Sequence, residues 1–279
     1  MDQSKILQLK KTANNVRLGI IEAVYNAKCG HPGGSLSIAD VLTYLYFEEM
    51  NVDPKNPADA ARDRFVLSKG HTAPALYSVL AERGFFPKEE LKTLRKTASR
   101  LQGHPDMKGV PGVDMSTGSL GLGFSTACGM ALSAKVSGDS YRVYAIIGDG
   151  ESQEGQVWEA AMFAAHYKLD NLVAILDWNG LQIDGPITEV MNPTPHDDKF
   201  RAFGWHVITI DAHDFCAIES ALKEAREVKG KPTVIIAKSV KGKGVSYMEN
   251  ACEWHGQAPK EDLYLVAVDD LKKIEEELK

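Results

Sequence analysis

The chain contains 279 residues, of which 44% are hydrophobic and 25% are charged, and its net charge is −6. This length and composition can bury a substantial core, which excludes a disordered protein and a small scaffold that depends on disulfides. The acidic balance, with lysine and arginine scattered along the sequence, disfavours binding to nucleic acid or to an anionic membrane surface.

Helical patterns alternate with short loops in the first hundred residues. Apolar residues recur at helical spacing over residues 4–28 and stop at CGHPGGS, whose Gly and Pro end the predicted helix. The period resumes over residues 37–50, with Ser37 as the expected N-cap. A short apolar run, RFVLSKGH, then leads into predicted helices over residues 72–84 and 87–97.

Residues 101–123, LQGHPDMKGVPGVDMSTGSLGLG, form the most irregular segment of the sequence. Loops this long are uncommon in compact domains unless they are functional, so we expect part of a site here. From Leu120 onward the sequence predicts a helix lined with small residues.

The remaining sequence alternates strand and helix patterns. Four β-branched runs occur at residues 143–147, 172–176, 206–210 and 233–237, and amphipathic segments at residues 155–168, 199–204 and 217–229 separate them. Apolar strands joined by helices predict an α/β fold with an open, mostly parallel sheet that helices cover on both faces. We expect one domain over residues 1–279, and a solvated surface helix over residues 268–279.

The cysteines and the N-terminal sequence bear on the cellular compartment. Cys29, Cys128, Cys216 and Cys252 are far apart and form no Cys-x-x-Cys pair, so we expect free thiols in a reducing compartment. The N-terminal residues lack a signal-peptide pattern, and no apolar run reaches about eighteen residues, which a membrane-spanning helix needs. The expected location is cytoplasmic.

Asp149 lies between two glycines directly after the predicted strand 143–147. Ligands of open parallel sheets bind beyond the carboxyl ends of the strands, and Gly148 and Gly150 leave room for close approach. A carboxylate repels a phosphate unless a cation lies between them, so Asp149 favours a Mg²⁺ ligand shared with phosphate oxygens. Asn179 follows the next strand and offers an amide oxygen of the kind that suits Mg²⁺. The alternative is that both segments are simple tight turns.

Histidines next to glycine give a second signal. His31, His71, His104 and His255 all adjoin glycine, and loops built on a rigid scaffold often carry chemistry. A zinc site is the weaker interpretation, because no short His-x-x-His or Cys-x-x-Cys pair is present.

The motifs together resemble the thiamine-diphosphate-binding N-terminal half of transketolases. The resemblance covers nearly the whole chain, through CGHPGGSL (29–36), LSKGH (67–71), LQGHPD (101–106), STGSLGLG (116–123), GDGESQEG (148–155) and DWNGLQIDG (177–185). It implies a single diphosphate-binding domain and an enzyme that transfers a two-carbon ketol unit from a ketose phosphate to an aldose phosphate.

The resemblance also implies roles for individual residues. Asp149, Asn179 and the carbonyl of Leu181 would hold Mg²⁺, and Gly150, Glu151, His71 and His255 would bind the cofactor, the two histidines and the Gly150 amide at its diphosphate. Gly118 and Leu120 would line the aminopyrimidine, and Ile183 would pack on the cofactor rings. His31 and His104 would bind the donor hydroxyls and move protons. Catalytic roles are thus implied for His31, His71, His104, His255 and Glu154; Glu154 and Glu159 match acidic residues between two active sites.

Whole transketolases are more than twice as long and carry a second, pyrimidine-binding domain. We expect that domain on a separate C-terminal subunit, in a two-plus-two heterotetramer. Without it, the chain could be a cofactor-holding scaffold that is inactive alone.

Two departures and several alternatives remain open at this point. Leu122 replaces a usual Gln, and Lys241 or Lys243 could reach a phosphate, although a solvated loop is the favoured interpretation. Other thiamine enzymes are possible, namely a sugar-catabolic ketose-phosphate transketolase, an acyloin synthase or a 2-oxoacid dehydrogenase subunit. Nucleotide binding ranks low, because the Gly-x-Gly-x-x-Gly and Gly-Lys-Ser/Thr fingerprints are absent.

Overall fold

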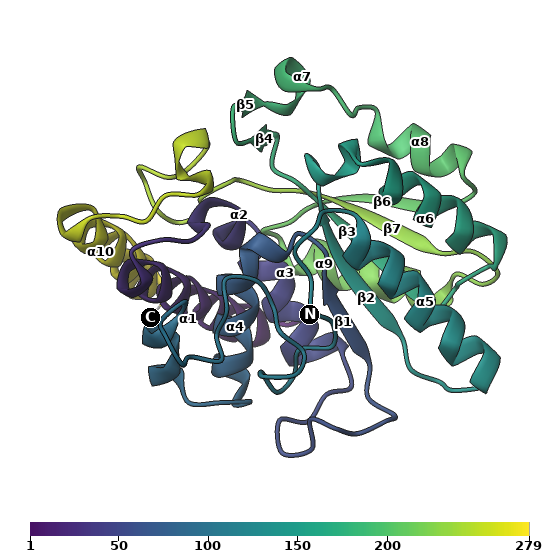
Figure 1. Cartoon of the computed structure of the whole chain (residues 1–279), viewed down its shortest axis with the longest axis horizontal. Helices are drawn as coiled ribbons and strands as arrows, with labels where there is room; N and C mark the ends of the chain where they lie inside the picture. Colours follow the sequence, from purple (N-terminus) through teal and green to yellow (C-terminus); the bar gives the residue numbers. More distant parts are fainter. Residues whose placement is uncertain (279) are drawn as a thin grey trace.

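The computed structural model describes residues 1–278 and has a five-stranded parallel sheet at its centre, in the order β1-β2-β3-β7-β6 (Figure 1). A small antiparallel pair, β4 (Leu181–Gln182) and β5 (Gly185–Pro186), follows β3. The predicted α/β fold with a parallel sheet is confirmed. The strands of the large sheet are β1 (Arg64–Leu67), β2 (Val143–Gly148), β3 (Leu172–Trp178), β6 (His206–Asp211) and β7 (Thr233–Lys238).

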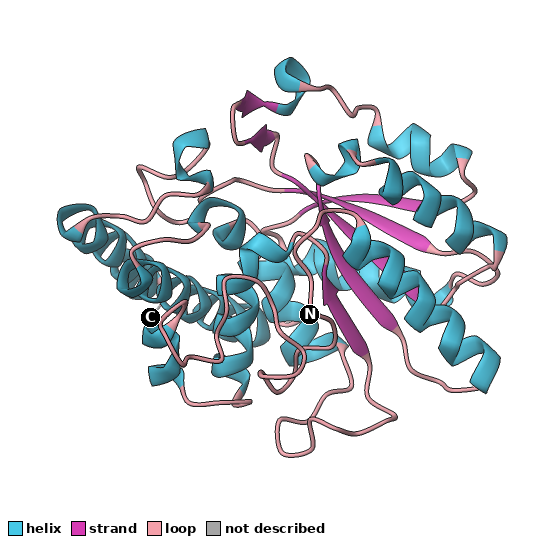
Figure 2. Cartoon of the chain, viewed as in Figure 1, coloured by secondary structure: helices cyan, strands magenta, loops and turns pink. Residues whose placement is uncertain are grey.

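Helices cover both faces of this sheet (Figure 2). The α-helices are α1 (Gln3–Ala27), α2 (Pro32–Leu36), α3 (Ala39–Tyr44), α4 (Ala73–Arg83), α5 (Leu122–Ser137), α6 (Gly155–His166), α7 (Ile187–Val190), α8 (His196–Ala202), α9 (Phe215–Glu227) and α10 (Glu261–Glu277). A π-helical turn, η1 (Leu45–Glu49), and the 3₁₀ segments η2 (Gly70–Thr72), η3 (Lys88–Thr93), η4 (Glu151–Gln153) and η5 (Cys252–His255) complete them.

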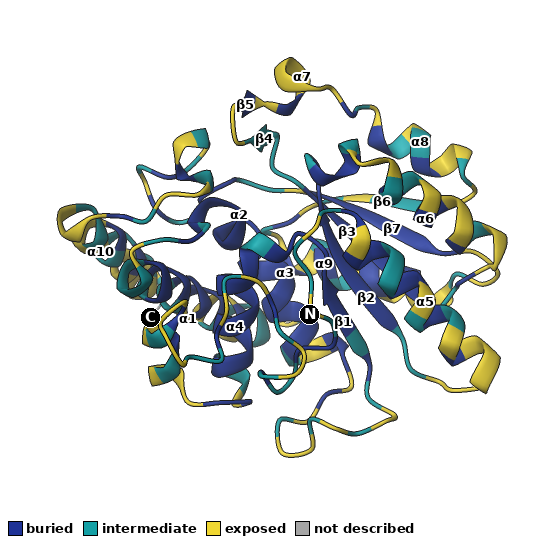
Figure 3. Ribbon diagram, viewed as in Figure 1, coloured by how far each residue is buried: buried dark blue, intermediate teal, exposed yellow. Residues whose placement is uncertain are grey.

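Each central strand contributes alternate side chains to two separate cores. On β2, Val143, Ala145 and Ile147 pack with buried residues of α5 and α6. Tyr144 and Ile146 point to the opposite face, where residues of α1, α3, α4 and α9 form the larger core. The strands are therefore buried on both sides (Figure 3), as expected for uninterrupted apolar runs.

The second predicted helix differs from the structure at its start. The helix predicted over residues 37–50 begins at Ala39 and ends in the π-helical turn η1, and Ser37 is not its N-cap. The hydroxyl oxygen of Ser37 instead lies 3.0 Å from the carbonyl oxygen of Gly34 and 2.8 Å from Oδ2 of Asp177, the nearer and charged acceptor for its one proton. Residues 32–36 already form the short helix α2, since proline is well tolerated at the first position of a helix. Ser37 therefore follows α2 and does not cap the start of the next helix.

Three further helix predictions need correction. Residues 87–97 contain only the 3₁₀ segment η3, after which Arg95 adopts a φ of 58°. Of the segment 199–204, only residues 199–202 belong to a helix, α8, which begins at His196 and ends at Ala202. The C-terminal helix α10 begins at Glu261, before the predicted residue 268, and it is not merely a solvated helix, because Leu271 is buried and its carbonyl accepts a hydrogen bond from Asn14 at 2.8 Å. Residue 279 lies outside the described residues.

Within the described chain, no helix combines the length and the apolar character that crossing a membrane requires. The four cysteines are free thiols in residues 1–278, as predicted.

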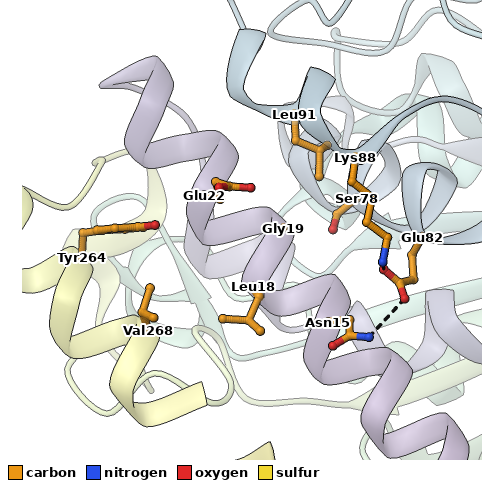
Figure 4. Close-up of a pocket in the computed structure, with 10 residues that line it drawn as sticks. All are labelled: Asn15, Leu18, Gly19, Glu22, Ser78, Glu82, Lys88, Leu91, Tyr264 and Val268. Carbon is orange, nitrogen blue, oxygen red and sulfur yellow. Dashed lines mark hydrogen bonds and ion pairs between the residues drawn. The ribbon is translucent and has the colours of Figure 1, made fainter. Parts of the chain in front are cut away.

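Helices α1 and α4 approach each other closely at Gly19, beside a groove that α10 closes on its other side (Figure 4). A Cβ atom at Gly19 would collide with the hydroxyl of Ser78 and lie 3.0 Å from Cδ1 of Leu91. Ser78 cannot move freely, because its hydroxyl donates to the carbonyl of Val16 at 2.7 Å. Glycine at this position therefore serves helix packing.

We expect the Gly19→Ala variant to unfold with a free energy about 1–3 kcal/mol lower than that of the parent, because the added methyl overpacks the α1–α4 contact. The matched control is Gly129→Ala on α5, where a Cβ meets nothing within 4 Å and should stabilise the helix by about 0.5–1 kcal/mol. Urea denaturation of both variants measures the difference; equal midpoints would contradict the prediction.

Candidate functional site

Strands β1, β2, β3 and β7 end at one edge of the sheet, and the segments that follow them surround a cavity of about 320 Å³. Ligands of open parallel sheets bind at such an edge. Predicted site residues that line this cavity are His31, His71, Gly118, Leu120, Asp149, Gly150, Glu151, Glu154, Asn179, Leu181, Ile183 and His255. The structure thus brings together nearly every site residue that the sequence indicated.

Asp149 projects from the end of β2 and is only 2% exposed. The backbone N–H of Gly150 donates to its Oδ1 at 2.8 Å, and that of Gly180 donates to its Oδ2 at 2.6 Å. Burial, reinforced by the nearby carboxylate of Asp177, raises the pKa of Asp149 to about 7. Two backbone bonds therefore orient the carboxyl group and favour its charged form, while burial and Asp177 oppose that form.

The segment after β3 supplies further oxygen atoms. Oδ1 of Asn179 accepts a hydrogen bond from the backbone N–H of Leu181 at 3.2 Å, while its Nδ2 donates to Asp177 at 2.8 Å. Leu181 lines the same cavity, and its carbonyl accepts from Nζ of Lys241 at 3.0 Å. The amide of Asn179 is thus fixed with its oxygen directed away from Asp177.

Lys241 corrects an expectation, because its side chain does not belong to a solvated loop. It is 2% exposed, lines the cavity and lies 3.1 Å from Nδ1 of His255. Burial, together with the charge of Lys69, lowers the pKa of Lys241 to about 8. Lys243 is directed elsewhere and pairs with Glu249 at 3.2 Å.

A buried ion pair between Lys69 and Asp177 lies beneath the cavity, and neither residue was expected from the sequence. Nζ of Lys69, which follows β1, is 2.6 Å from Oδ2 of Asp177, near the end of β3. Asp177 also accepts from the hydroxyls of Ser37 and Ser239. Although burial alone would raise it, the pKa of Asp177 is lowered by Lys69 and by the hydrogen bonds from Ser239 and Asn179. Lys69 belongs to the motif LSKGH and Asp177 to the motif DWNG. The sequence signal that could have indicated them is a charged residue at or just after the end of a buried strand.

Glu151 lines the cavity, but its carboxylate is occupied by the protein. One oxygen accepts from the hydroxyl of Ser68 and from the N–H of Gly121, and the other accepts from the N–H of Gly148. Burial raises the pKa of Glu151 despite these bonds. Glu151 thereby joins the segments that follow β1 and β2 to the start of α5, a different task from the cofactor contact that the sequence suggested.

Three histidines that line the cavity form a cluster. The ring centroids of His31, His71 and His255 are 5.0 to 5.5 Å apart. Burial and then neighbouring positive charges lower the pKa of His31 to about 4 and that of His255 to about 3, and they also lower the pKa of His71. All three rings are therefore neutral at pH 7, and each can offer one donor and one acceptor nitrogen.

His104 is not among the residues that line the cavity, although its ring lies next to one of them. A Cβ at Gly118 would be 3.6 Å from the His104 ring. The carbonyl of His104 accepts from the hydroxyl of Tyr77 at 2.9 Å, and burial and Arg95 lower the pKa of the His104 ring. His104 is thus a neighbour of the cavity-lining residue Gly118 and does not itself line the cavity.

Glu154 and Ile183 lie at the cavity rim and face solvent. Ile183 is 65% exposed at the tip of the β4–β5 hairpin, and Glu154 is exposed just before α6. Leu122, the unusual residue of its loop, is 52% exposed at the start of α5, and Glu159 is exposed on α6. The rim of the site is therefore open on this side of the molecule.

The donor set fits a hard cation better than a soft one. Nowhere in residues 1–278 do three His, Cys, Asp or Glu side chains converge in an arrangement that could hold a metal. What the cavity offers is one carboxylate from Asp149, one amide oxygen from Asn179 and one carbonyl from Leu181. Such oxygen ligands, completed by phosphate oxygens, suit Mg²⁺.

Comparison with known proteins identifies the family. Residues 8–273 match the family model described as the transketolase thiamine diphosphate binding domain. The chain belongs to this family. It is 48% identical to the 6-deoxy-6-sulfo-D-fructose transketolase subunit SqwG of Clostridium sp. over 96% of this chain and 97% of that one. It is 44% identical to an apulose-4-phosphate transketolase subunit of Phocaeicola vulgatus over 99% and 97%, respectively.

Longer relatives match over only part of their length. Human transketolase is 46% identical over 92% of this chain, which covers 41% of the human protein. The crystal structure of Campylobacter jejuni transketolase superposes with a TM-score of 0.89 at 34% identity, covering 98% of this chain and 43% of that one. The chain therefore spans about two fifths of these transketolases and nearly the whole of the two subunits.

We expect the Lys69→Met variant to lose about 3–5 kcal/mol of unfolding free energy, because it leaves the buried carboxylate of Asp177 without its counter-charge. The double variant Lys69→Met, Asp177→Asn should lose less than the sum of the two single losses, since each single change leaves a buried charge behind. Guanidinium unfolding of the three variants measures this coupling. Additive losses would show that the two groups do not depend on each other.

Proposed function

We propose that this chain is the diphosphate-binding subunit of a split transketolase, which transfers a two-carbon ketol unit from a ketose phosphate to an aldose phosphate with thiamine diphosphate and Mg²⁺. The observation that carries the proposal is the convergence, in one cavity, of the Asp149 carboxylate, the oxygens of the β3 turn and the side chain of Lys241. Family membership and the names of the two relatives of matching length support it.

The cofactor and its metal ion would be held by oppositely charged and polar groups that line one cavity. Asp149, Asn179 and the Leu181 carbonyl would bind Mg²⁺, while Lys241 and Lys69 would favour the diphosphate. The N–H of Gly150 would serve the diphosphate only by leaving Oδ1 of Asp149, to which it donates in this structure. Bound thiamine diphosphate supplies the electron sink for cleavage and formation of the carbon–carbon bond. The remaining task for the chain is to hold the sugar and to move its protons.

The histidine cluster suits that task. His31 is neutral, so its ring nitrogens can donate to and accept from sugar hydroxyls, whereas Nδ1 of His255 lies 3.1 Å from Nζ of Lys241 and leaves only its Nε2–H to donate to a ligand. A histidine at the site can give up a proton at one step and take one at the next. His104, which lies beside Gly118 and outside the cavity lining, would bind a more distant hydroxyl of the same donor.

Completion of the site would come from a second, separately encoded chain. The rim formed by Ile183 and Glu154 is exposed. A surface that a pyrimidine-binding domain covers in the complex would be exposed in this way when the chain is alone. The names of the relatives call them subunits, and longer transketolases contain more than twice this length. We infer a two-plus-two heterotetramer, in the cytoplasm as the free thiols favour.

The second copy of this chain would pack on the outer face of α5 and α6. Large apolar side chains exposed there are Leu122, Met162, Phe163 and Tyr167. Apolar side chains gathered on a surface mark an interaction site more often than single ones do. Glu154 and Glu159 lie beside this face, which supports their inferred place between two active sites.

Two classes of ketol donor fit the proposal, namely common and unusual ketose phosphates. The two relatives of matching length are named for a sulfo sugar and for apulose phosphate, which favours a sugar-catabolic enzyme as the second candidate. A panel of donors, including pyruvate for the acyloin synthase alternative, assayed with the partner chain separates these functions.

Asp149→Ala should lower the affinity for thiamine diphosphate in the presence of Mg²⁺ on the order of 100-fold, since loss even of a supporting group near a metal costs 10–100-fold. Isothermal titration calorimetry measures the affinity. Asp139→Ala, at an exposed position before β2, is the matched control and should bind as the parent does. Parent-like binding by Asp149→Ala would remove the basis of the proposed function.

Phe163→Glu should weaken self-association of the chain by about tenfold or more, because a charge would replace a central apolar contact. Sedimentation velocity over a concentration series gives the association constant. Leu265→Glu changes a residue that is 60% exposed on α10 and should leave association unchanged. If both variants associate alike, the α5–α6 face is not the interface.

A further inference from the structure

A closed ring of hydrogen bonds surrounds the base of the turn that carries Lys241. Three buried or largely buried side chains form the ring, namely Arg17 from α1, Asp40 from α3 and His213 from the segment between β6 and α9. The backbone from Val240 to Lys243 closes it. None of the three side chains lines the cavity, so the proposed chemistry has no direct use for them.

Arg17 and Asp40 form the charged half of the ring. The guanidinium of Arg17 contacts both oxygens of Asp40, with Nη1 3.1 Å from Oδ1, and its Nε donates to the carbonyl of Lys243 at 3.2 Å. Burial would raise the pKa of Asp40, but Arg17 and His213 outweigh it and lower this pKa to about 2. The carboxylate is thus a permanent acceptor.

His213 forms the other half, and its tautomer follows from its partners. The backbone N–H of Val240 donates to Nε2 of His213 at 3.0 Å, so Nε2 carries the lone pair. The ring proton therefore resides on Nδ1, which donates to Oδ2 of Asp40 at 2.7 Å. His213 in this form joins a fixed carboxylate to the residue directly before Lys241.

The ring fixes both ends of a very short segment. Val240 is held through its N–H and Lys243 through its carbonyl, and between them the N–H of Gly242 donates to the carbonyl of Gly33 at 2.9 Å. The aliphatic stem of Lys241 passes Gly33, where a Cβ would be 3.1 Å from Lys241 Cγ. With its backbone held at three points, Lys241 places Nζ beside the Leu181 carbonyl and His255.

We propose that the Arg17–Asp40–His213 ring positions Lys241 for the cofactor diphosphate, and that His213 is a positioning residue which acts through its acceptor bond to Val240. The inference rests on the proposed function, since it takes the diphosphate to be the ligand that Lys241 meets. A long lysine side chain loses much conformational entropy when it is fixed. A backbone that is already fixed before the ligand binds therefore reduces the entropy cost of binding.

The test compares three variants of one residue in the full-length chain. His213→Gln retains an acceptor near the position of Nε2 and so keeps the bond to Val240. His213→Asn retains a group near Nδ1 that can reach Asp40 but loses that acceptor, and His213→Phe loses both. Calorimetric affinity for thiamine diphosphate with saturating Mg²⁺ is the readout, with circular dichroism and urea unfolding of each variant alongside.

The expected result is an affinity about tenfold lower for the Phe and Asn variants and within about threefold of the parent for the Gln variant. In a Lys241→Met background, which itself lowers the affinity, His213→Phe should cause no further loss, because its effect passes through Lys241. A purely structural role would instead reduce affinity in step with stability and equally for Asn and Gln.

Two results overturn the inference: Phe and Asn variants that bind within about twofold of the parent, or losses for His213→Phe and Lys241→Met that add in full. If His213→Phe does not fold, the affinities of His213→Asn and His213→Gln decide the question, because equal affinities of these two variants would overturn the inference. Failure of the parent chain to bind the cofactor at all is a separate outcome, which would overturn the proposed function.

Discussion

The buried ion pair between Lys69 and Asp177 is the constraint on which the site depends. It joins the segment after β1 to the end of β3, and the hydroxyls of Ser37 and Ser239 attach α2 and the segment after β7 to the same carboxylate. A buried pair of charges is tolerated only when further hydrogen bonds satisfy the remaining atoms, and here they come from two other segments. The positions of these segments, and of the Asn179 amide, therefore depend on one another.

Around this pair the cavity combines opposite charges in a way that favours an anion and a cation together. Lys241 and the Lys69–Asp177 pair lie near Asp149, whose carboxylate is buried without a counter-charge of its own. The neighbouring histidines contribute no charge at neutral pH, because burial and the lysines hold them in the neutral form. A metal diphosphate matches this arrangement better than either ion alone would.

Much of the fold and of the candidate site could be predicted from the sequence. The strand runs at residues 143–147 and 172–176 are apolar on both faces, so their burial and the placement of Asp149 and Asn179 at the sheet edge followed directly. Glycine-flanked histidines were a sound guide for His31, His71 and His255. Local patterns at residues 37–50 and 87–97 were less reliable, because α2 and the π and 3₁₀ turns are set by tertiary packing.

What the sequence could not reveal were contacts between distant segments. Lys241 looks like a loop lysine, and its burial follows from the approach of Gly33 and Leu181, which are both far from it along the chain. The same holds for Arg17, Asp40 and His213, which lie on three different elements and meet only in the folded chain. Their residue types alone gave no sign of a shared network.

The wide spacing of the site along the chain also has a consequence for ligand binding. His31 lies more than two hundred residues before Lys241 and His255 in the sequence, and the last two touch or adjoin residues of α2 and β4. A chain in which β1, β2 and β3 have paired but the segment after β7 has not docked on α2 lacks one wall of the cavity. Any ligand of this hollow therefore binds only the chain in which the segment has docked, and by mass action it stabilises that state.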